Sequence, residues 1–82
     1  MITDEFLGIL RCPESRQPLK RSDAQLVAKV NREIAAGRLR NRAGHTVVKP
    51  VDGLLVREDD HLAYPMIDDI PILLADEAVE LT

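Results

Sequence analysis

The sequence contains a single cysteine, Cys12, among its 82 residues. An intrachain disulfide is therefore impossible, and this cysteine usage fits the reducing conditions of the cytoplasm. No apolar run approaches the roughly 20 residues that a membrane-spanning helix needs, and residues 1–5 lack the basic-then-apolar order of a signal peptide. We therefore expect a soluble, cytoplasmic protein.

Aromatic residues are almost as scarce, because Phe6 and Tyr64 are the only two. Proteins that bind single-stranded nucleic acid stack bases on aromatic rings, so this scarcity argues against such a function. The sequence also lacks a glycine-rich phosphate-binding loop and a G-x-S-x-G motif, which leaves the enzymes that depend on them unsupported. We expect no catalytic residue and no cofactor.

The charged residues are distributed unevenly along the chain. Residues 1–49 carry ten basic and five acidic side chains, whereas residues 50–82 carry one basic and nine acidic ones. The two halves can attract each other within one domain, 1–82, which is what this length supports. The alternative is a basic binding face. Arg38, Arg40 and Arg42 would share one face of a strand and contact phosphates there, although solvated or acid-paired arginines are the favoured interpretation of this pattern.

Two helices are expected in the first half. A short one runs from Thr3 or Asp4 through Leu10. The second begins at Ser22, because Ser22-Asp23-Ala24-Gln25 has the S-x-x-Q form of a capping box. It ends near Ala36, before Gly37, a residue suited to a left-handed helix end. Its apolar stripe, which has helical spacing and should pack on the sheet, consists of Leu26, Val27, Val30 and Ile34.

The remaining apolar residues indicate strands separated by turns. Expected strands cover residues 19–21, 38–42, 46–48, 54–57, 61–67 and 70–74, with acidic turns at 58–60 and 68–69 and a frayed helix over 76–79. Pro65 and Pro71 each remove a backbone donor and are therefore expected at a sheet edge or a strand start. The sequence thus predicts an α+β fold, in which a small antiparallel sheet of three or four strands packs against the second helix.

The residues around Cys12 lie where a zinc knuckle of the form CPxC would sit, but the second sulfur is missing. Cys12, His45 and His61 supply at most three of the four ligands that structural zinc takes, and Glu14 would have to complete the site. Cys12 with either histidine as base has the residue types of a thiol enzyme. A buried or turn-capping cysteine with surface histidines is the simpler interpretation.

Two motifs in this order resemble a known family. Residues 10–19, LRCPESRQPL, resemble the L-x-C-P-x-C-x-x-x-L opening of small zinc-ribbon-like proteins related to the activator subunit of eukaryotic tRNA, rRNA and release-factor methyltransferases. Residues 62–74, LAYPMIDDIPILL, resemble that family's second signature, L-A-Y-P-I-x-D-G-I-P-x-L-L. The resemblance implies a zinc-ribbon-like scaffold with an inserted helical segment over about 22–50, similar in position to the insertion of the eukaryotic activators.

The sequence departs from the family at its metal-binding positions. The second cysteine of the knuckle is Ser15, and the cysteine expected before the second motif is replaced around Val56-Arg57. The resemblance therefore implies that the metal has been lost, with Cys12 and Ser15 as the remains of the knuckle. The D-G turn of the family is Asp68-Asp69 here, and aspartate tolerates a left-handed conformation better than most residues.

The resemblance also implies a function, because the eukaryotic activators have no catalysis of their own and add a strand to the sheet of a methyltransferase. We therefore expect a non-catalytic subunit whose sheet edge docks on a SAM-dependent methyltransferase. The partner-binding residues implied are Phe6, Leu7, Ile67, Ile70, Ile72 and Leu74. The alternatives are a nucleic-acid-binding module that uses Arg38 to Arg42, and a stand-alone zinc or thiol protein that uses Cys12.

Overall fold

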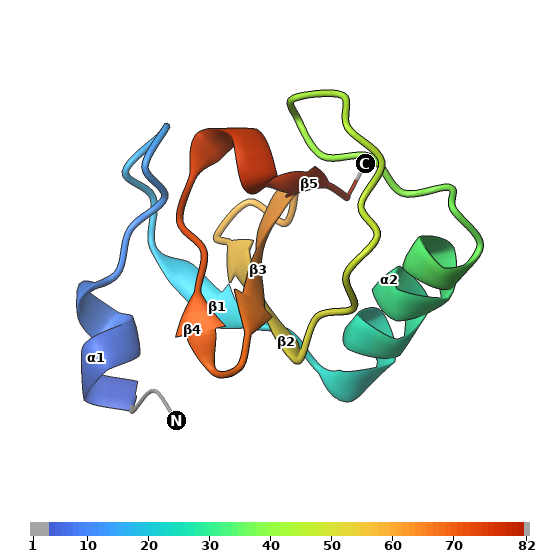
Figure 1. Cartoon of the computed structure of the whole chain (residues 1–82). Coiled ribbons are helices and arrows are strands. Elements are labelled where there is room, and N and C mark those ends of the chain that lie inside the picture. Colours follow the sequence, from blue (N-terminus) through green and yellow to red (C-terminus); the bar gives the residue numbers. More distant parts are fainter. Residues whose placement is uncertain (1–3, 82) are drawn as a thin grey trace.

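The structure is a computed structural model that describes residues 4–81, and it places a curled antiparallel sheet between two helices (Figure 1). The elements are α1 (Asp4–Ile9), β1 (Leu19–Arg21), α2 (Ala24–Ala35), β2 (Gly53–Arg57), β3 (Leu62–Ile67), β4 (Ile70–Pro71), the 3-10 helix η1 (Ala75–Glu77) and β5 (Val79–Glu80). The strands follow the order β1-β2-β3-β4, and β5 also pairs with β3. The predicted α+β class and antiparallel sheet are confirmed.

The hairpin formed by β2 and β3 is the centre of the sheet, with Leu55 opposite Tyr64. Its acidic turn is held by Asp59, whose carboxylate accepts hydrogen bonds from the His61 backbone N–H at 3.0 Å and from Arg57 Nε at 2.9 Å. Successive side chains of a strand point to opposite faces. The hairpin therefore divides the apolar side chains between two cores.

The first core lies on the side of α1. Tyr64 and Leu55 are fully buried in it, and Leu7 and Leu10 pack against it. Its buried members are Cys12, Leu19, Leu55, Leu62, Tyr64, Met66 and Ala78. Because α1 has only six residues, far fewer than the roughly 12–15 that an isolated helix needs in water, it depends on this packing.

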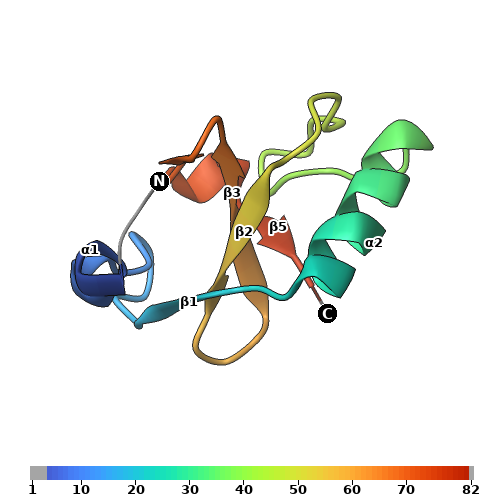
Figure 2. The ribbon, with the colours of Figure 1, turned by 90° about the horizontal axis from the view of Figure 1, so that it is seen from below.

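The second core lies on the side of α2, and the two helices flank the sheet in both views (Figure 2). Its buried members are Val30, Ile34, Val51, Leu54, Val56 and Ala63, with Leu26 and Val27 packed against them. The predicted apolar stripe of this helix is therefore confirmed. α2 has 12 residues, and no helix within residues 4–81 has the length and apolarity to cross a membrane.

The ends of α2 differ in part from the prediction. Asp23, not Ser22, is the N-cap, and its carboxylate accepts a hydrogen bond from the Leu26 N–H at 2.8 Å. The reason is that the Ser22 N–H donates to the carbonyl of Leu54 at 3.0 Å, which ties Ser22 to β2 before the helix starts. Gly37 follows the helix with a φ of 71°, so the predicted left-handed helix end is confirmed. The predicted cap at Thr3 of the first helix lies outside the described residues.

Pro65 lies in the central strand β3, so its expected position at an edge or strand start is wrong. Its carbonyl accepts a hydrogen bond from the Ile72 N–H at 2.9 Å, which shows that its backbone faces away from β2. On that side β5 pairs with residues 62–63 and β4 pairs with residues 66–67. Pro65 falls in the gap between these two short strands, where a missing donor costs no ladder hydrogen bond. Pro71 lies in the edge strand β4, as predicted.

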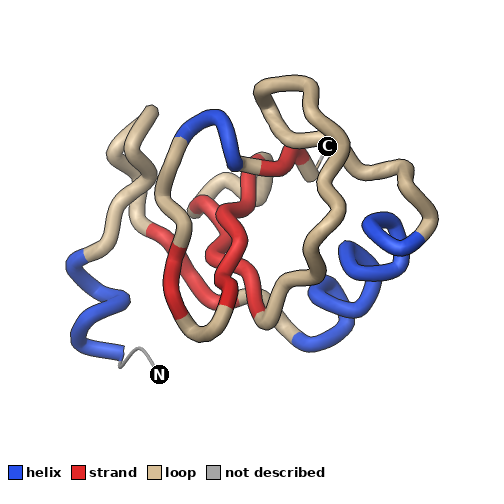
Figure 3. Tube along the Cα trace, viewed as in Figure 1, coloured by secondary structure: helices blue, strands red, loops and turns tan. Residues whose placement is uncertain are grey.

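A long loop joins α2 to β2 (Figure 3), and the strands predicted over 38–42 and 46–48 do not form. Arg40 and Thr46 make only an isolated bridge. The Asn41 side chain accepts a hydrogen bond from the His45 N–H at 3.1 Å, so a local turn replaces a longer ladder. The predicted basic strand face is therefore wrong.

The C-terminal segment also differs from the prediction, because the helix expected over 76–79 is only partly present. The 3-10 helix η1 ends at Glu77, and Val79 belongs to β5, where it pairs with Ala63. Val79 is buried in the structure. Burial of one apolar side chain against β3 therefore prevails over the weak helical pattern of this segment.

Candidate functional site

Cys12, which the resemblance assigns to a degenerate zinc knuckle, makes a buried polar contact. Cys12 is only 1% exposed, and its Sγ lies 2.8 Å from the Tyr64 hydroxyl oxygen, with either atom able to donate the hydrogen bond. The backbone N–H of Ser15 also donates to Cys12 Sγ at 3.5 Å. The loop closes through the Arg16 N–H, which donates to the carbonyl of Cys12 at 2.8 Å. This arrangement orients the thiol toward the core.

The ionisation of this pair is shifted in opposite directions. Burial raises the pKa of the Cys12 thiol, but hydrogen bonds from Ser15 and Tyr64 outweigh it and lower the pKa to about 7. Burial and the hydrogen bond to Cys12 raise the pKa of the Tyr64 hydroxyl. When the pair loses a proton, the negative charge therefore resides on the sulfur.

Arg57 lies near the position at which the zinc-ribbon-like proteins that the sequence resembles have a further cysteine. Its guanidinium binds the Asp59 carboxylate through Nε at 2.9 Å and Nη2 at 2.8 Å. The hydrogen bond to Asp59 raises the pKa of Arg57, and interaction with Cys12 raises it further. A cation thus lies near the thiol, at the position where the zinc-ribbon-like proteins that the sequence resembles have a cysteine, and an arginine cannot bind zinc.

The residues present do not fit a zinc ion. Within residues 4–81, no three His, Cys, Asp or Glu side chains are grouped closely enough to hold a metal. His61 lines a small polar pocket with Glu14, whereas His45 lines a separate cavity on the side of α2. The ligand set of Cys12, His45, His61 and Glu14 is therefore not assembled. Because Cys12 is almost completely buried, a substrate also has no direct access to its thiol.

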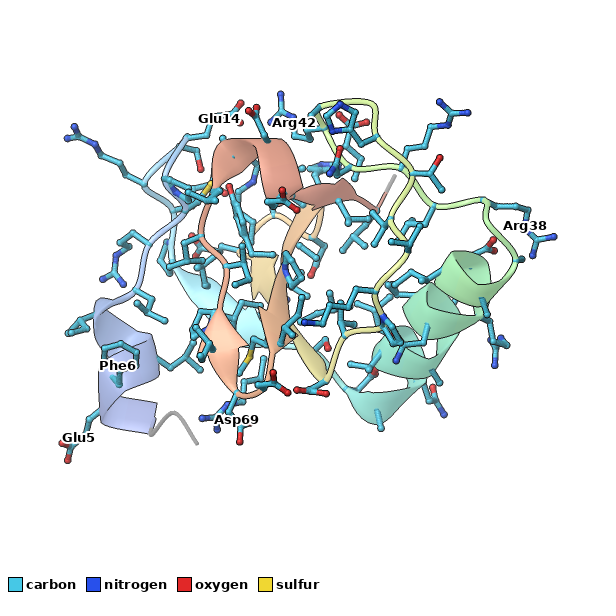
Figure 4. All side chains as sticks on the ribbon, in the orientation of Figure 1. Glu5, Phe6, Glu14, Arg38, Arg42 and Asp69 are labelled. Carbon is cyan, nitrogen blue, oxygen red and sulfur yellow. The ribbon has the colours of Figure 1, made fainter. Side chains whose placement is uncertain are left out.

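The three arginines of the supposed basic face are engaged separately. Arg38 Nε donates to the Glu33 carboxylate at 2.8 Å. Arg42 pairs with Glu14, and Figure 4 shows these two side chains approaching each other from separate loops. Arg40 Nη1 donates to the carbonyl of Gly44 at 3.4 Å. The acid-paired interpretation of this segment therefore holds for Arg38 and Arg42.

The predicted partner-binding residues divide into two groups. Phe6, Ile70 and Leu74 are exposed, with relative solvent accessibilities of 44%, 60% and 62%. Ile72, which lies between Ile70 and Leu74 in the chain, is partly buried. The other two, Leu7 and Ile67, lie apart: Leu7 packs into the first core, and Ile67 lines the cavity on the side of α2.

One exposed residue of α1 and one cleft are features of the structure that the sequence pattern did not predict. Ile9 is 72% exposed, although its position in an apolar helix suggested burial. The cleft has a volume of about 580 Å³ and lies between the first half of α2 and the adjoining ends of β2 and β3. A sequence pattern gives the faces of single elements, and neither feature follows from one element alone.

Comparisons with known proteins identify relatives over nearly the whole chain. A protein of Vesicomyosocius okutanii subsp. Calyptogena okutanii, described as a UPF0434 protein, is 32% identical over 81 residues, which cover 99% of this chain and 88% of that protein. A Xylella fastidiosa protein, solved by solution NMR, has a similar fold with a TM-score of 0.75 and 25% identity, covering 96% of this chain and 81% of that one. No family model matches the chain. The extent and identity of the first match show that the chain belongs to the UPF0434 family.

Proposed function

We propose that this protein is a non-catalytic binding subunit that docks on an enzyme through apolar side chains of α1 and of the segment that contains β4. We call this the α1–β4 surface and define it by Phe6, Ile9, Ile70 and Leu74. The preferred partner is a SAM-dependent methyltransferase. The UPF0434 relationship leaves this function open, and the proposal rests on the surface together with the resemblance of residues 10–19 and 62–74 to methyltransferase activators.

The distribution of exposed apolar side chains carries the proposal. Within residues 4–81, the exposed large hydrophobic residues are Phe6, Ile9, Val48, Ile70 and Leu74. Four of these five belong to α1 or to the segment 70–74, and both segments lie on the side of β3 away from α2 (Figure 1, Figure 2). Exposed apolar side chains concentrated on one side of a small protein are typical of an interaction site.

The backbone of β4 limits how a partner strand can add. Met66 is opposite Pro71, and the Met66 carbonyl accepts the Asp52 N–H on the side of β2. Met66 and Pro71 therefore form a pair without mutual hydrogen bonds, and the backbone polar groups of Pro71 point to the outer edge. Because proline has no N–H, this edge offers an acceptor there but no donor. Apolar side chains must then supply most of the affinity.

The proposal is tested by capture of partners from the source organism. The tagged wild-type protein is expected to recover, as identified by mass spectrometry, a protein with a Rossmann-type methyltransferase domain. Ile70→Asp should abolish that recovery, because a charge would be buried in an apolar interface. Recovery of only nucleic acid, or of no methyltransferase, would contradict the proposal.

Val48→Asp is the matched control. Val48 is 81% exposed and lies in the loop that joins α2 to β2, outside the α1–β4 surface. This variant should recover the partner as the wild type does, and the circular dichroism spectra of both variants should match the wild type. Raising the salt from about 50 to about 200 mM should scarcely change recovery, whereas binding through about six phosphate contacts would fall on the order of a thousandfold.

A further inference from the structure

The cleft beside α2 is lined mainly by apolar atoms, and several of its lining residues are small. Ala24 and Ala28 of α2 face Gly53 at the start of β2, and Val27, Leu54 and Met66 complete the floor. A Cβ built on Gly53 would come no closer than 3.6 Å to the nearest atom, Met66 Sδ. A side chain at this position would therefore be in van der Waals contact with Met66, and Gly53 leaves that volume to the cleft.

The rim of the cleft is mainly acidic. Asp23, Asp52 and Asp69 line it, and Arg21 is the only basic residue that does so. Figure 4 shows Asp69 at the lower end of the sheet, the end at which α2 begins. Two of the carboxylates are held in place, because Asp23 accepts the Leu26 N–H and Asp52 accepts the Asp68 N–H. Fixed carboxylates around an apolar floor attract a cation with an aliphatic stem.

A polar group without a partner lies in the same wall. The Ser22 hydroxyl is buried and has no hydrogen-bond partner among the described residues, and Ser22 lines the cleft. Buried polar groups are normally hydrogen-bonded, and one that is not has a cost of about 1–3 kcal/mol. Because this oxygen is not exposed to solvent, a ligand in the cleft would reach it only if the surrounding side chains moved.

We infer that this cleft binds a short basic segment of a partner protein, in which the aliphatic part of an arginine or lysine side chain covers Ala28, Gly53 and Met66 and its charged end meets the acidic rim. The inference goes beyond the proposed function, because the cleft adjoins α2 and not the α1–β4 surface. Charge complementarity decides the occupant, since the rim carries three carboxylates against one guanidinium.

The test is a titration of the ¹⁵N-labelled full chain with two peptides, acetyl-Leu-Arg-Leu-Arg-amide and the same peptide with citrulline in place of arginine. Citrulline has the same shape without the charge. Amide shift changes are expected at the cleft, including those of Ala28 and Gly53, and the arginine peptide should bind about tenfold more tightly at low salt. Diffuse shift changes, or equal affinities for the two peptides, would overturn the inference.

Variants that keep the fold make the test specific. Asp23→Asn and Asp52→Asn together remove two charges while their side-chain oxygens still accept the same backbone hydrogen bonds, and asparagine is as good an N-cap as aspartate. This double variant should bind the arginine peptide at least about threefold more weakly. Ala28→Met fills the floor from an exposed helix position and should also weaken binding. Unchanged affinity in the double variant would refute the role of the rim.

Glu58→Gln is the matched control, because Glu58 is exposed, carries the same charge and does not line the cleft. It should leave the affinity unchanged. A small polyamine also combines positive charges with aliphatic carbon chains, and spermidine tests this alternative ligand. A spermidine affinity equal to that of the arginine peptide would refute a protein segment as occupant. Because these titrations use the isolated chain, their failure is distinguishable from failure to capture a methyltransferase.

Discussion

The helix on one side of the sheet is twice as long as the helix on the other, and the two sides are completed differently. α2 has 12 residues, an aspartate N-cap and a left-handed glycine after its end, and it covers a core made of aliphatic residues. α1 has six residues, and the exposed Arg11 guanidinium donates hydrogen bonds to the carbonyl of Gly8 near its end and to the carbonyl of Leu10 just beyond it. The α1 side also contains the buried contact between Cys12 and Tyr64.

This difference separates stability from binding. The α2 side satisfies its own helix ends and buries its apolar stripe, so its core needs no partner for stability. The α1 side leaves Phe6 and Ile9 exposed on a helix too short to be stable alone. We therefore expect α2 and its core to support the fold, and the α1 side to be completed by a partner.

The largest expected effect concerns the pH dependence of the α1 side. The pKa of Cys12 is about 7 in the folded protein, below its ordinary value of 9.0. A lowered pKa in the folded state contributes stability that is fully present above the unfolded pKa and is lost as the pH falls through the folded pKa. The free energy of unfolding should therefore rise by roughly 1–2 kcal/mol between pH 7 and pH 9.

Urea denaturation at a series of pH values measures this rise, and Cys12→Ala should abolish it. Tyr64→Phe should reduce it, because it removes one of the hydrogen bonds that favour the thiolate. The slope with pH, not the absolute stability, is the quantity to compare, since both substitutions also alter the first core. A wild-type slope that persists in Cys12→Ala would show that another group on either side of the sheet causes it.

A smaller effect is expected at the start of α2. Asp23→Ala removes the N-cap and should lower the free energy of unfolding by about 1 kcal/mol. Ser22→Ala is the matched substitution one residue earlier, and it should be neutral or slightly stabilising because the Ser22 hydroxyl has no partner among the described residues. Urea denaturation of both variants is the measurement. A larger loss of stability in Ser22→Ala than in Asp23→Ala would show that Ser22, and not Asp23, caps α2.

The sequence was most informative where one element determines the outcome. Val30 and Ile34 are buried as the helical spacing of their stripe requires, and Gly37 ends the helix as expected. Where residues distant in the chain decide, prediction was wrong about the position or did not name the partner. Pro65 is central because β4 and β5 leave a gap beside it, and Arg42 pairs with Glu14, 28 residues away in the chain. The local sequence pattern shows neither the strands that flank Pro65 nor the ion pair of Arg42, because both depend on residues far away in the chain.

The candidate sites show the same limit. The exposure of Phe6, Ile70 and Leu74 agrees with a docking role inferred from the resemblance. Leu7 and Ile67 are apolar residues of the same kind, but Leu7 packs into the first core and Ile67 lines a cavity on the side of α2. Apolar character alone does not separate contact surface from core. The cleft beside α2 depends on Ala28 and Gly53 meeting across two elements, which only the packed structure reveals.

The smallest expected effect lies in the turn that leads from β3 into β4 on the α1 side. Asp68 and Asp69 form a two-residue turn between the paired residues Ile67 and Ile70, and both have positive φ, at 54° and 62°. Turns of this type favour glycine at the second position, because a side chain in a left-handed conformation is strained. Asp69→Gly should therefore raise the free energy of unfolding by about 0.5–1 kcal/mol.

Glu58→Gly is the control, since Glu58 does not have positive φ and glycine there should destabilise by a similar amount. Loss of stability in Asp69→Gly would mean that the interactions of this carboxylate outweigh its backbone strain. The turn beside β4 would then contribute more to the stability of the α1 side than we expect.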